Sequence, residues 1–449
     1  MRIFRSAWIV PVDKPPMEDA AVAIEEGGIV AVASADEVLA RFGDRARRLQ
    51  GPSGVTDLGD AVVLPALVNA HTHLELSWME QAPPPRGDFT AWVRALIARQ
   101  APSPEEIARG IDRAIAAIVA SGTAAIGDVG NTTAALAPLR ASSLEGRFFL
   151  EVIGWQERGA ARFDDAERDL DAASTGASVP HGTSRASRAS RAPNRPGAAA
   201  LFPGSLVPLG PHAADPDLLR RMADRARARA DIVSVHLAES AAEDALLRRG
   251  DGPLRALMDE IGALPVGWTP PGLSPAQVLD AAGLLGPRTI AVHGVHLTRE
   301  DARLLAARGT TLALCPRSNA WVGAGVAPVA MLLEEGVRLA LGTDSLASNT
   351  DLDLLAELAS LRALSPGVPA AALVRAATLG GAEALGVADA WGSVTPGKRA
   401  PLIALPMAPH AGRATSEGPR TAGAGAPDEE PYRTVFAGAR GADLRILRD

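Results

Sequence analysis

Two histidines separated by one residue, His71 and His73, lie at the end of an apolar run that begins at Val63. Such a run predicts a β-strand, in which residues i and i+2 project from the same face. Both imidazole rings can therefore reach a single ion. Taken alone the pair is a weak signal, because histidines also occur at strand ends as ordinary polar residues.

Further polar side chains follow the apolar runs that come later in the chain. His236 ends one such run, Glu239 follows it three residues later, and Asp344 ends another. Three histidines and an aspartate suit Zn²⁺ or Fe²⁺ and leave an open position for water. We therefore predict one divalent ion, with Zn²⁺ favoured over Fe²⁺, and four ligands: His71, His73, His236 and Asp344. Glu239 is placed to move protons rather than to bind the metal.

Eight short runs of apolar or β-branched residues would position these side chains, and longer Ala-, Leu- and Arg-rich stretches of helical character separate them. The runs are Val63–His73, Thr123–Asp128, Arg147–Val152, Ser205–His212, Asp231–His236, Thr289–His293, Thr310–Cys315 and Arg338–Asp344. Repeated strand–helix units predict a parallel sheet, and eight of them predict a closed (β/α)₈ TIM barrel of the α/β class. The polar residues cluster where the runs end, which is where such barrels carry their active sites.

The two ends of the chain contain shorter strand-like pieces. Those near the start are Trp8–Val10, Ala21–Ile24 and Ile29–Ala33, and those in the tail are Pro401–Leu405 and Thr434–Phe436. Short strands need several partners to be stable. We therefore expect residues 1–62 and 391–449 to form one small composite β-sandwich that flanks a barrel domain of residues 63–390.

Residues 174–200 repeat Ser-Arg-Ala and contain almost no large apolar side chain. This composition cannot offset the entropy lost on ordering, so we predict a disordered insertion in the barrel domain, with a basic anion-binding loop as the alternative. The stretch 411–430 has a similarly loose composition.

The bulk composition excludes several classes of protein. The 449 residues are 47% apolar and 22% charged, enough to bury a large core, and the net charge of -7 includes no basic stripe that could bind nucleic acid. No apolar stretch is long enough to predict a membrane span. The single cysteine, Cys315, and the lack of an apolar leader predict a cytoplasmic protein.

Taken together, these motifs resemble the amidohydrolase superfamily, in its cytosine deaminase and chlorohydrolase-like branch. The similar segments run over nearly the whole chain: Leu64–His73, His236–Glu239, Cys315–Asn319, Gly342–Ser345 and Gly392–Ala400. Many superfamily members bridge two metal ions with a carboxylated lysine. No lysine occurs between residues 15 and 397, so a lysine-bridged binuclear centre is excluded and a mononuclear site is favoured.

The resemblance also implies catalytic roles. Asp344 would accept a proton from the attacking water, Glu239 would protonate a ring nitrogen and later the leaving group, and His293 would orient the water. His212 matches a position that usually contacts the substrate. Ala213–Asp215 follows it where relatives commonly have a small residue, Pro and Tyr, which puts this contact in doubt.

The segments His73–Ser77 and Phe89–Val93 look most like aminofutalosine deaminases and related adenosine-type deaminases. We therefore expect a small-molecule substrate, a 6-aminopurine nucleoside or an analogue, that is hydrolysed with release of ammonia. The expected substrate contacts are His212, Glu75, Trp78, Ser318 and Asn319.

Other functions are compatible with the same residues. A chlorohydrolase, a guanine- or cytosine-type deaminase, or a cyclic-amide hydrolase would keep the metal site and change the pocket. A non-catalytic binding relative would be expected to have lost ligands, and none is missing here. A homodimer is a further possibility that the sequence leaves open.

Overall fold

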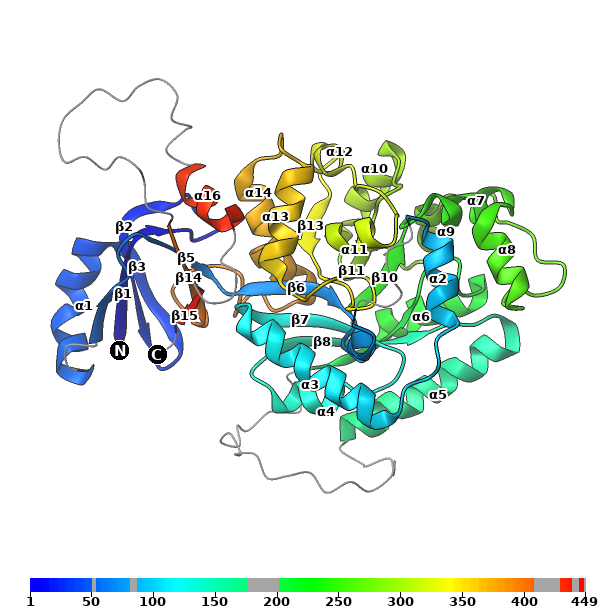
Figure 1. Cartoon of the computed structure of the whole chain (residues 1–449), viewed down its shortest axis with the longest axis horizontal. Coiled ribbons are helices and arrows are strands. Elements are labelled where there is room, and N and C mark those ends of the chain that lie inside the picture. Colours follow the sequence, from blue (N-terminus) through cyan, green and yellow to red (C-terminus); the bar gives the residue numbers. More distant parts are fainter. Residues whose placement is uncertain (51–53, 81–86, 176–201, 408–428, 438–443, 448–449) are drawn as a thin grey trace. The chain divides into compact units, whose positions relative to one another are not determined.

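The computed structural model describes residues 1–50, 54–80, 87–175, 202–407, 429–437 and 444–447. They form two compact units. The first comprises Met1–Val68, Ala120–Ala124 and the described part of Asp353–Asp449, and the second comprises Asn69–Val119 and the described part of Ala125–Leu352. Figure 1 labels the helices and strands of both units.

The first unit contains a seven-stranded sheet built from both ends of the chain. Its order is β15-β14-β5-β1-β2-β3, with β4 beside β1. The strands are β1 (Arg2–Ile9), β2 (Met17–Glu25), β3 (Gly28–Ser34), β4 (Val55–Asp57), β5 (Ala61–Pro65), β14 (Leu402–Pro406) and β15 (Arg445–Leu447). Strand β14 pairs antiparallel with β5, so strands from the two ends of the chain lie in one sheet, while the composite β-sandwich of residues 1–62 and 391–449 remains a prediction.

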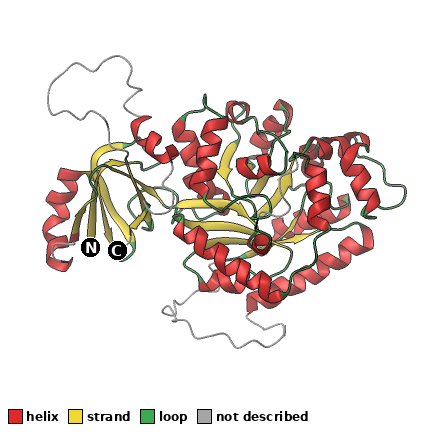
Figure 2. Cartoon of the chain, viewed as in Figure 1, coloured by secondary structure: helices red, strands yellow, loops and turns green. Residues whose placement is uncertain are grey.

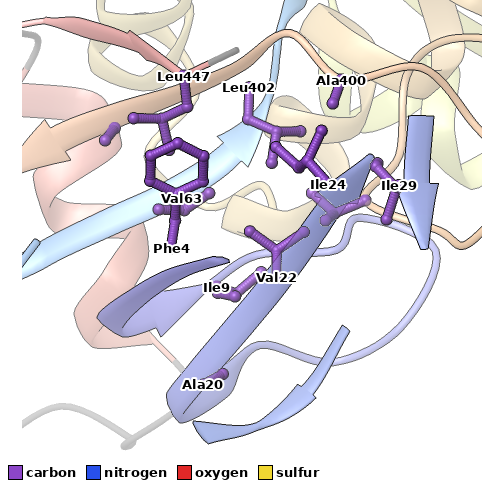
Figure 3. Close-up of a cluster of buried hydrophobic side chains, with 12 residues drawn as sticks. Phe4, Ile9, Ala20, Val22, Ile24, Ile29, Val63, Ala400, Leu402 and Leu447 are labelled. Atoms are coloured by element: carbon purple, nitrogen blue, oxygen red, sulfur yellow. The ribbon is translucent and has the colours of Figure 1, made fainter. Parts of the chain in front are cut away.

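Alternation along the strands gives this sheet two apolar faces. Phe4, Val22 and Ile24 lie in a buried cluster with Leu402 and Leu447, shown in Figure 3. Their neighbours in sequence, among them Ile3 and Ala23, lie in a second cluster with Ala35, Val38 and Ala46 of α1 (Ala35–Gln50). The period of two therefore places successive side chains in two different cores.

Two expectations about strands were wrong. The stretch Thr434–Phe436 lies in helix α16 (Glu430–Ala437), where Tyr432 and Val435 are buried at the i, i+3 spacing of a helix. The run that begins at Val63 is divided at Ala66, and its first part is β5 of the seven-stranded sheet. Only the second part, β6 (Leu67–Thr72), leads to the histidine pair.

The remaining strands form two four-stranded sheets, β6-β7-β8-β9 and β10-β11-β12-β13. They are β7 (Thr123–Gly130), β8 (Glu145–Val152), β9 (Gly204–Pro208), β10 (Val233–Leu237), β11 (Thr289–His293), β12 (Thr311–Leu314) and β13 (Arg338–Leu341). All eight predicted runs thus contain a strand.

Two backbone contacts connect the edges of these two sheets. A parallel bridge joins Thr72, at the end of β6, to Asp344, which follows β13, and the amide of His236 in β10 donates to the carbonyl of Leu209, which follows β9, at 3.0 Å.

Helices alternate with these strands along the chain (Figure 2). In the second unit they are α2 (Phe89–Ile97), α3 (Pro104–Ala120, which ends in the first unit), α4 (Leu136–Ala141), α5 (Gln156–Thr175), α6 (Pro216–Arg229), α7 (Ala241–Arg249), α8 (Gly252–Glu260), α9 (Pro275–Ala281), α10 (Arg299–Arg308), α11 (Pro316–Trp321) and α12 (Val329–Glu334). The first unit adds α13 (Leu354–Leu364), α14 (Ala370–Arg375) and α15 (Gly381–Leu385). Asp215, Ser274 and Thr298 cap the starts of α6, α9 and α10.

The predicted insertion 174–200 lies almost entirely outside the described residues, since α5 ends at Thr175 and the description resumes at residue 202. Most of the stretch 411–430 also lies outside them. Among the helices that are described, none has both the length and the apolar character needed to cross a bilayer.

Removal of the Phe4 ring should destabilise the first unit. Phe4 is 2% exposed in the cluster of Figure 3, so Phe4→Ala should leave a cavity and cost about 3–5 kcal/mol of folding free energy. Differential scanning calorimetry should show a lower transition temperature for this variant. Val30→Ala is the matched control, because Val30 is 37% exposed on the same sheet. Equal transition temperatures for the two variants would contradict the assignment of Phe4 to a core.

Candidate functional site

Five side chains from the ends of four strands converge in the second unit. His71 lies in β6, His236 in β10 and His293 at the end of β11, while His73 and Asp344 follow β6 and β13. Two groups have ligand atoms within 4.8 Å of one another: His71 with His73 and His236, and His71 with His293 and Asp344. The structure therefore brings together all four predicted ligands, and it adds His293.

The spacing of the ring nitrogens fits a metal ion. Nε2 of His71 and Nε2 of His73 are 3.1 Å apart, and the two rings meet edge to face with centroids 4.7 Å apart. Two nitrogen ligands of a tetrahedral Zn²⁺ at ordinary bond lengths would be separated by about 3.3 Å. Nδ1 of His71 is buried without a hydrogen-bond partner.

Hydrogen bonds fix the orientation of two of these rings. Nδ1 of His236 donates to the Leu209 carbonyl at 2.7 Å, so Nε2 is the nitrogen left for an ion. Nδ1 of His293 lies 2.8 Å from Oδ1 of Asn319 and donates to it, so Nε2 of His293 is likewise free to act in the site.

The carboxylate of Asp344 is held by a hydroxyl group. Ser318 donates to Oδ2 at 2.6 Å, while Oδ1 lies 3.7 Å from Nε2 of His73. Ser318 and Asn319 were expected to contact the substrate. Their side chains, 0% and 1% exposed, instead hold Asp344 and His293, and any contact with the substrate remains a prediction.

The backbone is strained around the cluster. Ala238, His293 and Asp344 adopt φ values of 49°, 74° and 58°, a region that residues other than glycine rarely occupy. Each follows or ends a strand whose side chains face the cluster. Strain of this kind is typical of functional sites, where the surrounding structure determines the backbone conformation.

The electrostatics keep the ligands in the protonation states that a metal needs. Burial lowers the pKa of His71 well below its usual value and that of His73 to about 4, so both rings are neutral at pH 7. Burial also opposes ionisation of Asp344. The neighbouring His73 and His293 and the Ser318 hydroxyl outweigh it, so the pKa of Asp344 falls below its usual value.

The pKa of Glu239 is raised, whereas that of Asp344 is lowered. Burial raises the pKa of Glu239 to about 8, and its Oε1 lies 3.7 Å from Nε2 of His293. In the metal-free protein this carboxyl is therefore largely protonated at pH 7, whereas a nearby cation would favour its ionised form. A group balanced in this way can both donate and accept a proton.

The other residues predicted to contact the substrate, Glu75, Trp78 and His212, belong to neither candidate ligand group. Both oxygens of Glu75 are engaged, since they accept hydrogen bonds from the amides of Asn131 and Thr132 and from the Thr132 hydroxyl at 2.9–3.0 Å. Trp78 packs with Trp92 in an apolar cluster. His212 lines a cavity of about 370 Å³ beside α2, α5 and α8. Whether these residues contact the substrate remains a prediction.

The sequence analysis missed three buried acids near the cluster. Asp128 in β7 accepts from the Leu74 amide at 2.8 Å, Glu151 in β8 lies 3.7 Å from Nδ1 of His236, and Glu243 in α7 accepts from the Glu239 amide at 3.1 Å. Burial raises the pKa of both Asp128 and Glu151. Asp128 ends one of the predicted strand runs, so the strand-end argument applied to the histidines would have found it.

The sequence of this chain is similar to those of known hydrolases. The model of a family described as the amidohydrolase family matches residues 62–439. The 5-methylthioadenosine/S-adenosylhomocysteine deaminase of Moorella thermoacetica is 29% identical over 431 residues, which cover 90% of this chain and 85% of the relative. The aminodeoxyfutalosine deaminase of Deinococcus radiodurans is 32% identical over 377 residues, which cover 80% and 81% of the two chains.

Solved structures agree on the fold. The aminofutalosine deaminase of Helicobacter pylori, in complex with methylthio-coformycin, superposes with a TM-score of 0.77 at 20% identity and covers 99% of this chain and 100% of its own. A zinc-bound adenosine deaminase of Xanthomonas campestris gives a TM-score of 0.71 at 23% identity and covers 99% and 91%. From the family match, the relatives and the converging strand ends, we conclude that this chain belongs to the amidohydrolase family and has its α/β TIM-barrel type of fold.

Proposed function

We propose that this protein is a mononuclear metal-dependent deaminase that hydrolyses a 6-aminopurine nucleoside or a close analogue and releases ammonia. The observation that carries the proposal is the buried group of four histidines and Asp344 beside Glu239, whose pKa burial raises to about 8. The relatives named as deaminases of adenosine-like nucleosides support the substrate class.

We further propose that β6 to β13 close into one eight-stranded barrel, and that the predicted β-sandwich of residues 1–62 and 391–449 extends to Pro65, the end of β5. The bridge between Thr72 and Asp344 and the bond from His236 to Leu209 support closure, because they connect the edges of the two four-stranded sheets. A cytoplasmic location and a homodimer remain predictions.

The metal site fits Zn²⁺, and the zinc-bound relative supports that choice over Fe²⁺. His71, His73, His236 and Asp344 would hold the ion, which when bound supplies a Lewis acid and a water that is nucleophilic at neutral pH. Oδ2 of Asp344 is engaged by Ser318, so Oδ1 is the oxygen that faces the ligand histidines and can take a proton from the water.

Glu239 handles the remaining proton transfers, while His293 orients the water. Water adds to the ring carbon that bears the amino group, and Glu239 gives a proton to the adjacent ring nitrogen. Glu239 then passes the proton of the new hydroxyl group to the amino group, which leaves as ammonia while the carbonyl forms, and the proton that Asp344 took from the water restores Glu239 to its protonated form. His293 is held by Asn319 with Nε2 directed into the site, so it can orient the water during the attack.

A substrate panel tests the proposal directly. Purified protein loaded with zinc should release ammonia from adenosine, 5-methylthioadenosine, S-adenosylhomocysteine or aminodeoxyfutalosine, with a shift of the purine absorbance as the amino group is replaced. Guanine, cytosine, a chlorinated triazine and a cyclic amide complete the panel. Turnover of one of these four, with none of the nucleosides, would assign the site to a different hydrolase reaction.

The metal content should depend on the predicted ligands. Elemental analysis should find about one zinc or iron ion per chain, and His236→Ala should lower that stoichiometry several-fold because it removes one of about four ligands. His296→Ala is the matched control. Nε2 of His296 donates a hydrogen bond to the Ala324 carbonyl at 2.8 Å, and His296 lies in neither candidate ligand group. Full metal content in the His236 variant would contradict the ligand assignment.

Loss of the Glu239 carboxyl should abolish turnover without loss of the metal. Glu239→Gln keeps the size of the side chain and removes its proton, so kcat should fall by about 10²–10⁴-fold. The exposed Glu300→Gln is the control, and it should retain full activity. Unchanged kcat in the Glu239 variant at full metal content would show that another group moves the proton.

A further inference from the structure

Two buried polar atoms beside the candidate site face each other without a hydrogen bond. Nδ1 of His212 and Oε1 of Glu243 are 3.7 Å apart, and neither atom has another hydrogen-bond partner in the described structure. Glu243 is 2% exposed. A buried carboxylate oxygen without a partner costs free energy, so a small approach of the two side chains would be favourable.

The second oxygen of Glu243 connects this pair to the proton-transfer residue. Oε2 accepts a hydrogen bond from the backbone amide of Glu239 at 3.1 Å. Glu243 lies in the first turn of α7, directly after the strand that carries His236. One carboxylate therefore contacts both the segment that positions Glu239 and the ring of His212.

The chemistry of this contact determines which nitrogen of His212 carries a proton. An ionised carboxylate only accepts hydrogen bonds, so Nδ1 of His212 must donate to it. Nε2 is then the nitrogen that remains for a ligand in the 370 Å³ cavity that His212 lines.

We propose that Glu243 is a positioning residue that fixes the tautomer and orientation of His212, so that Nε2 is presented to the substrate. The statement that Nε2 meets the substrate rests on the proposed deaminase function. The assignment of the His212 tautomer holds whether or not the protein is a deaminase. The competing role for Glu243 is purely structural, as an acceptor for the Glu239 amide at the start of α7.

Glu243→Gln separates these two roles. The amide oxygen of glutamine can still accept from the Glu239 backbone, which preserves the start of α7. Its NH₂ group would then face His212 and donate to Nδ1, so the ring proton should move from Nδ1 to Nε2. A purely structural Glu243 would leave the tautomer of His212 unchanged.

The tautomer can be read from ¹⁵N chemical shifts of histidine-labelled, zinc-loaded protein. His212→Gln identifies the resonances of His212, and His296, which is bonded to the Ala324 carbonyl, serves as the internal reference. The wild-type protein should carry its proton on Nδ1, and Glu243→Gln should carry it on Nε2. A wild-type ring protonated only at Nε2, or the same tautomer in both proteins, would overturn the proposal.

A double-mutant cycle adds a functional readout at full zinc content. Glu243→Gln and His212→Gln should each lower kcat/KM by about 10-fold, mainly through KM, because His212 contacts a part of the substrate that does not react. If Glu243 acts through His212, the double variant should be no worse than His212→Gln alone. Multiplicative losses would show that Glu243 acts independently and would refute the positioning role.

The two proposals fail in different ways. If the wild-type protein deaminates no nucleoside, the proposed function fails, and the NMR comparison still decides the tautomer of His212. If nucleosides are deaminated and the tautomer is insensitive to Glu243, only the inference about Glu243 fails.

Discussion

The structure depends on the close approach of imidazole nitrogens in a buried site. Nε2 of His71 and Nε2 of His73 are 3.1 Å apart, while His71 and His236 meet with ring centroids 5.0 Å apart. Burial keeps the rings of His71 and His73 neutral, so each ring has one nitrogen whose lone pair can bind a cation. A divalent cation would fit between these nitrogens, and the ionised Asp344 would supply part of the balancing charge. The geometry of the surrounding strands holds the groups in this arrangement.

Strand ends provide that geometry because they combine a rigid support with backbone freedom. Up to its last residue, a strand is fixed by its neighbours in the sheet. Ala238 directly after β10, His293 at the end of β11 and Asp344 three residues after β13 adopt positive φ values. The backbone thus leaves the direction of the strand at the site, and this change of direction helps to point the side chains toward the histidine cluster.

The sequence singled out the residues of this cluster because their signal is local. His71 and His73 are related by the period of a strand, His236 lies near the end of an apolar run that is itself a strand, and Asp344 follows another such run. The division between β5 and β6 was not predictable in this way, because Val63 and Leu64 are apolar in either sheet and only their pairing with β14 separates them. Glu243 was missed for a similar reason. Its partner His212 is distant in sequence, and only the fold brings the two side chains to 3.7 Å.

The hydrogen bonds that orient the site come from residues that follow neighbouring strands. His236 of β10 is held by Leu209, which follows β9, and both His293 of β11 and Asp344 after β13 are held by residues of α11, which follows β12. Since β12 pairs with both β11 and β13, α11 carries Asn319 to one neighbour and Ser318 to the other. A slip of one residue in the pairing of β11 with β12 would turn the side chain of His293, the last residue of β11, to the opposite face. The register of the parallel strands, rather than any single ligand, therefore sets the precision of the metal site, and substitutions that disturb that register should impair metal binding even when every ligand is retained.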